Sequence, residues 1–123
     1  MKDVKHALHT LFLLLICSEL SIAQPVFSPE IRAKRETQWM KDSLHLNEVQ
    51  LTRAATINLN YQRDMDRAAE SPNKSKLQKQ TMQVKDKELK TILTREQYPI
   101  YYRREQMIRK RAKIKYTGPH QPL

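Results

Sequence analysis

The chain has 123 residues and a formal net charge of +10, with 23 lysines and arginines against 13 acidic residues. Its single cysteine leaves no disulfide to staple the fold, and its single glycine, Gly118, nearly excludes the hairpins and tight turns that need a positive φ. The composition therefore predicts an all-α protein whose small core is not reinforced by disulfides.

The first 23 residues have the three parts of a secretory signal: a basic start, the apolar run LFLLLIC, and small residues before a cut after Ala23. The apolar run is too short for a permanent membrane anchor. We therefore expect residues 1–23 to be a cleaved signal peptide and the rest of the chain to be exported. Ile16 before Cys17 disfavours lipidation of that cysteine, which stays the alternative.

The rest of the chain is expected to form one all-helical domain over residues 24–116, followed by a flexible tail at 117–123. Four helices joined by short turns predict an antiparallel hairpin arrangement. A chain this short, with a thin core and no disulfide, often gains stability by self-association, so we also expect a homodimer.

The first helix is predicted to begin at Pro29, behind the N-cap Ser28, and to end near Leu44. His45 then takes the left-handed position at which glycine is usual. The remaining helices are expected at about 47–70, 74–93 and 95–116, with Ser-Pro-Asn at 71–73 as the break between the second and third.

The second and fourth helices start with the related motifs LNEVQ and LTREQ, whose first residues are Leu46 and Leu93. In each motif a side-chain oxygen can accept from the backbone amide three residues on, while the glutamine reaches back, which is a capping box. The preceding leucine can act as a hydrophobic staple. We assign a structural role to the six motif residues Leu46, Asn47, Gln50, Leu93, Thr94 and Gln97.

These motifs resemble the repeated LTxxQ motif of the Spy/CpxP-like family of small periplasmic stress proteins. LTREQ matches the motif fully, and LNEVQ carries Asn47 in the threonine position. The resemblance covers about residues 36–104. It implies an all-α, elongated, cradle-like dimer in the periplasm. Members of that family bind unfolded proteins without nucleotide, modulate an envelope-stress sensor, or bind zinc.

Two helices carry more apolar surface than one neighbour can bury. In the second helix, Leu51, Ala55 and Leu59 widen an apolar stripe, which indicates a dimer partner or a client protein; the alternative is that all these residues are internal core. In the fourth helix, Ile100, Met107 and Ile114 recur every seven residues among cations.

A cationic surface that contains methionine suits adaptable binding to acidic or amphipathic segments. We therefore place the binding surface on the fourth helix; the alternative is a solvated basic helix end. The candidate residues are Ile100, Tyr101, Arg103, Arg104, Met107, Arg111 and Ile114.

Beyond the predicted signal peptide, the sequence offers no Gly-rich phosphate loop, no cysteine nucleophile and no His or Cys pair at metal-ligand spacing, so we expect no enzyme activity, cofactor or metal site. Export argues against nucleic acid as the target of the positive charge. The favoured function is an ATP-independent chaperone-like protein that binds unfolded or exposed segments of envelope proteins. The alternatives are a regulator that docks on a membrane stress sensor and a basic membrane-surface protein.

Overall fold

The computed structural model describes residues 26–116, with side-chain surroundings for residues 26–113. The predicted signal peptide, the tail at 117–123 and the side chain of Ile114 lie outside these ranges. The described chain is all-α, as predicted, and forms four helices. These helices are α2 (Pro29–Leu44), α3 (Glu48–Ala69), α4 (Lys74–Ile92) and α5 (Gln97–Tyr116).

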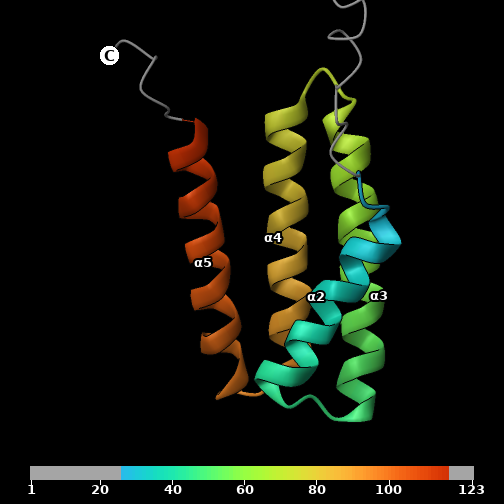
Figure 1. Cartoon of the computed structure of the whole chain (residues 1–123), viewed down its shortest axis with the longest axis vertical. Coiled ribbons are helices and arrows are strands. Elements are labelled where there is room, and N and C mark those ends of the chain that lie inside the picture. The colour runs from blue at the N-terminus through green and yellow to red at the C-terminus, as the bar shows by residue number, and fades with distance from the viewer. Residues whose placement is uncertain (1–25, 117–123) are drawn as a thin grey trace, which may run out of the picture.

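The helices alternate in direction, so that each runs antiparallel to the next (Figure 1). α3 and α4 stand side by side, α2 crosses α3 obliquely, and α5 stands on the other side of α4. The α2–α3 and α4–α5 connections lie at the same end of the molecule, whereas the α3–α4 turn lies at the opposite end. This topology brings the two related motifs, which occupy those two connections, into one place.

Local hydrogen bonds account for where α2 begins and ends. The Ser28 hydroxyl accepts from the Ile31 amide at 3.3 Å, and Pro29 is the first helical residue. At the other end His45 adopts the left-handed conformation, with φ 53° and ψ 51°. The chain therefore reverses within three residues and enters α3 at Glu48.

The start of α5 differs from the sequence-based expectation by two residues. The Thr94 carbonyl still accepts from the Tyr98 amide at 3.0 Å, but the regular helix begins at Gln97 and not at Arg95. Pro99 explains the shift because it has no N–H to donate to the Arg95 carbonyl. Since Pro99 is the third residue of α5, this loss falls in the first turn, and the helix continues unbroken to Tyr116.

The main hydrophobic core lies at the end of the molecule where the motifs meet. Leu46 and Leu93, the leucines of the two motifs, are buried in it, and Leu51 and Tyr98 pack against it. All four helices contribute to this cluster, whose buried members are Met40, Leu44, Leu46, Ala54, Leu89, Leu93 and Tyr101. One amide is fully buried as well: Asn58 on α3 donates to the Thr37 hydroxyl at 3.0 Å.

Candidate functional site

The two motifs form one hydrogen-bonded unit. The backbone amides of Asn47 and Thr94 donate to the side-chain oxygens of Gln50 and Gln97, at 3.1 and 2.9 Å. In return the Asn47 and Thr94 side chains accept from the amides of those glutamines, at 2.9 and 3.2 Å. Both helix starts therefore have a reciprocal capping box.

The glutamines also bind each other and the ends of other helices. Gln50 Nε2 donates to Gln97 Oε1 at 2.8 Å and to the Ile92 carbonyl at 2.9 Å. Gln97 Nε2 donates to the Leu44 carbonyl at 2.9 Å. Each glutamine thus links the start of its own helix to the last turn of a helix from the other hairpin, a pairing that sequence reasoning missed. We call this set of contacts the glutamine clasp.

Exposed residues of α5 keep the character expected of a binding surface. Ile100 and Met107 are 49% and 50% exposed, although both are large apolar side chains. Arg103, Lys110 and Arg111 are exposed as well. At 100° per residue these five side chains fall on one side of the helix. We call this set, Ile100, Arg103, Met107, Lys110 and Arg111, the α5 outer face.

Two candidates for the binding surface lie elsewhere. Tyr101 is completely buried in the core, and its hydroxyl donates to Asp86 Oδ1 at 2.8 Å. Arg104 Nη1 donates to both carboxylate oxygens of Glu36, at 2.8 and 2.9 Å, and its guanidinium lies 3.8 Å from the centroid of the Trp39 ring. Both side chains attach α5 to the other helices, because they lie on the side of α5 that faces the domain.

The sequence reasoning also missed a partly buried group of charges between α2, α4 and α5. Lys85, only 3% exposed, places Nζ 3.7 Å from Glu36 Oε1 and 3.6 Å from Glu105 Oε1. Arg109 Nη2 donates to both oxygens of Asp86, at 3.1 and 2.9 Å. Together with Arg104 these residues form what we call the ion cluster: Glu36, Lys85, Asp86, Arg104, Glu105 and Arg109.

The ion cluster is electrically balanced, since it holds three cations and three carboxylates. Such balance is needed because a buried charge without a partner is costly. Aromatic rings complete its surroundings: Lys85 Nζ lies 4.5 Å from the Tyr61 ring centroid and 5.6 Å from that of Tyr101. The chain's excess positive charge therefore lies outside this cluster, on other surfaces.

The two tyrosines beside Lys85 are held in their neutral form. Burial, reinforced by the negative charge of Glu105, raises the pKa of Tyr61 to about 12. The same two causes, together with the hydrogen bond to Asp86, raise the pKa of Tyr101 well above its usual value of 10. Neither phenol is therefore suited to act as a base near neutral pH.

A sequence signal for the ion cluster exists on α4. Lys85, Leu89 and Leu93 follow one another at intervals of four residues, which places Lys85 on the same stripe as two core leucines. A lysine on an apolar stripe predicts either a solvated edge or a buried ion pair. The partners Glu36 and Glu105 could not be named, because they come from two other helices.

Within residues 26–116 no group of three or more histidine, cysteine, aspartate or glutamate side chains is arranged to hold a metal ion. None of the helices in this range combines the length and the apolar character that crossing a membrane requires. The fold and site thus define a small all-α protein with a linked pair of capping motifs and a cationic, partly apolar face on its last helix.

The family described as "Domain of unknown function (DUF4890)" matches residues 21–101, and the chain belongs to this family. The match includes both capping motifs and the whole of α2, α3 and α4. It ends near the start of α5, so that most of the α5 outer face lies beyond it. No curated protein and no solved structure matches the chain.

Proposed function

We propose that this protein is an exported, ATP-independent chaperone-like protein that holds unfolded or exposed segments of other envelope proteins on the α5 outer face. The observation that carries the proposal is the exposure of Ile100 and Met107 among the cations Arg103, Lys110 and Arg111. Exposed apolar side chains supply holding energy of about 25 cal/mol per Å² buried. The cations attract acidic segments and hasten the encounter.

The ion cluster supports the proposal that only the outer face of α5 binds a partner. Because the charges of Arg104 and Arg109 are matched by the half-buried carboxylates of Glu36 and Asp86, one side of α5 is committed to the domain. The outer face is left for a partner. Methionine adds to its suitability, since its unbranched and polarisable side chain adapts to differently shaped apolar groups.

The capping motifs support a relation to the Spy/CpxP-like proteins. Their two copies stand together at one end of the molecule, where Gln50 and Gln97 are hydrogen-bonded to each other. This arrangement gives the repeated motif a structural purpose, namely to join two helical hairpins. We propose on this basis that the protein shares the family's periplasmic location and dimeric state.

The test is suppression of aggregation of an unrelated substrate, the reduced B chain of insulin, without ATP. Wild-type protein should suppress the light scattering, and Met107→Asp should abolish the effect while helicity is retained. Val49→Asp is the matched control, because Val49 on α3 is exposed and apolar but lies outside the α5 outer face. Raising the salt concentration should slow the capture of acidic substrates more than it weakens their retention.

Two results would contradict the proposal in favour of its alternatives. A protein that leaves aggregation unchanged, yet retains one folded sensor domain from an envelope extract, would be a regulator. A protein that leaves aggregation unchanged but binds vesicles containing phosphatidylglycerol would be a membrane-surface protein.

A further inference from the structure

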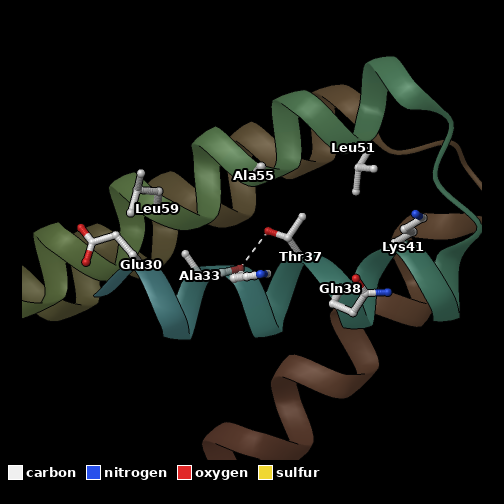
Figure 2. A pocket seen from close by; sticks show the side chains of 9 residues that line it. Glu30, Ala33, Thr37, Gln38, Lys41, Leu51, Ala55 and Leu59 are labelled. Atoms are coloured by element: carbon white, nitrogen blue, oxygen red, sulfur yellow. Dashed lines mark hydrogen bonds between the residues drawn. The ribbon is translucent and has the colours of Figure 1, made fainter. Parts of the chain in front are cut away.

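A second candidate binding site lies in a groove between α2 and α3, away from the α5 outer face. The groove is open to solvent and has a volume of about 380 Å³. On the α3 side Leu51 and Leu59 stand at either end with Ala55 between them, and Ala33 and Thr37 face them from α2 (Figure 2). The large and small side chains of α3 therefore leave a hollow at Ala55.

The inner surface of this groove offers few polar groups to a ligand. The Thr37 hydroxyl donates to the Ala33 carbonyl at 2.8 Å and accepts from Asn58 at 3.0 Å, so both of its functions are already used inside the protein. The backbone amides and carbonyls beside it are hydrogen-bonded within the two helices. A ligand would thus be held in the groove mainly by apolar contact.

The rim of the groove is cationic. Lys34 and Lys41 are exposed on α2 and line the groove two helical turns apart, a rise of about 10 Å. Among residues 26–113 neither lysine forms an ion pair. The acidic residue on the rim, Glu30, is already paired with Arg63 at 3.0 Å. Two positive charges are therefore left for a partner.

We propose that the groove binds an acidic amphipathic helix of another protein. A ridge of apolar side chains spaced three or four residues apart can enter the hollow at Ala55, between the two leucines. Acidic residues seven positions apart on the partner would then meet Lys34 and Lys41. An extended segment fits less well, because the groove walls are helices without unpaired backbone groups to receive a strand.

The charges also favour a foreign helix over a second copy of this chain. Two copies joined through their α2–α3 grooves would bring Lys34 and Lys41 close to like charges, and the chain as a whole carries +10. Such repulsion opposes association, whereas an acidic partner removes it.

The probe is a fluorescein-labelled synthetic peptide of about four helical turns, with leucines at positions i, i+4 and i+7 and glutamates seven apart on the flanks. Fluorescence anisotropy should show binding, and circular dichroism should show that the peptide becomes helical. A second peptide with lysines in place of the glutamates should bind at least about tenfold more weakly. Equal binding of the two peptides would overturn the proposal.

Variants of the protein locate the binding. Ala55→Gln fills the hollow at an exposed helical position, so the fold should survive and peptide affinity should fall at least about tenfold. Thr56→Gln, at the neighbouring exposed position, is the control. Lys34→Glu with Lys41→Glu should also weaken binding, whereas Lys76→Glu with Lys79→Glu makes the same change in net charge on α4 and should not.

The outcome is separable from that of the proposed chaperone function. Met107→Asp should leave peptide binding unchanged, and Ala55→Gln should leave suppression of insulin aggregation unchanged. Failure of the acidic peptide to bind wild-type protein would overturn the groove proposal alone. Loss of self-association in Ala55→Gln, measured by sedimentation, would also overturn it, because the occupant would then be a second copy of the chain.

Discussion

Replacing Gln97 by alanine should destabilise the protein far more than removing a helix cap. The change deletes three hydrogen bonds of normal length. Gln97 Oε1 accepts from the Thr94 amide at 2.9 Å and from Gln50 Nε2 at 2.8 Å, and Gln97 Nε2 donates to the Leu44 carbonyl at 2.9 Å. At roughly 1 kcal/mol of net stability for each bond, the expected loss is about 3 kcal/mol. Since small domains have only about 5–15 kcal/mol in total, this loss should be easily measured.

Thr94→Ala provides the internal comparison. It deletes the bond that the threonine hydroxyl accepts from the Gln97 amide at 3.2 Å, which should cost about 1 kcal/mol. Urea unfolding followed by circular dichroism, at one fixed protein concentration, gives both free energies of unfolding. If Gln97→Ala cost no more than Thr94→Ala, the contacts of the glutamine clasp between helices would contribute nothing and our reasoning would be refuted.

The double variant with Gln50→Ala tests the coupling of the two motifs. Because the two glutamines share their mutual hydrogen bonds, the pair should cost about 1 kcal/mol less than the sum of the single changes. Additive costs would show that the two caps act independently. Substrate binding by each folded molecule should be unchanged in all of these variants.

Three further predictions concern the ion cluster, pH and self-association. Lys85→Met should lower the free energy of unfolding by about 3 kcal/mol, because it leaves buried carboxylates short of a partner, whereas Lys87→Met at an exposed position should have little effect. Because the pKa of Tyr61 is raised to about 12 in the folded protein, this phenol contributes stability that is present below pH 10 and lost as the pH rises towards 12. Its ionisation can be followed by absorbance at about 295 nm, in a comparison with Tyr61→Phe. Ionisation of Tyr61 near pH 10 in the folded protein would contradict the prediction. The melting temperature should rise with protein concentration, as expected of a dimer, and a concentration-independent monomer in sedimentation would exclude it.

The sequence alone determined the fold class and nearly all helix boundaries. The scarcity of glycine indicated an all-α chain, and Ser28, Asn47 and Thr94 indicated where three helices begin. These features were readable because capping depends on atoms only three or four residues apart. The largest shift, of two residues from Arg95 to Gln97, arose from Pro99, because its missing amide hydrogen removes one of the bonds that define a helix start.

Only the tertiary structure decided which face of α5 is available. Helical periodicity separates Tyr101 from Met107, but it does not say which of them meets a neighbouring helix. Burial of Tyr101 follows from its position against the ends of the other helices, together with its hydrogen bond to Asp86. Arg104 is likewise held by Glu36, a residue 68 positions away in the chain.

The glutamine clasp and the ion cluster could not be predicted from the sequence either, because both depend on contacts between helices. The capping role of Gln50 and Gln97 is local and could be predicted, whereas their mutual hydrogen bond joins residues 47 positions apart. The sequence likewise placed Lys85 on an apolar stripe, but it did not identify the carboxylates that neutralise its charge. A sequence pattern specifies the side of a helix on which a residue lies, and the packing of helices against one another supplies its partner.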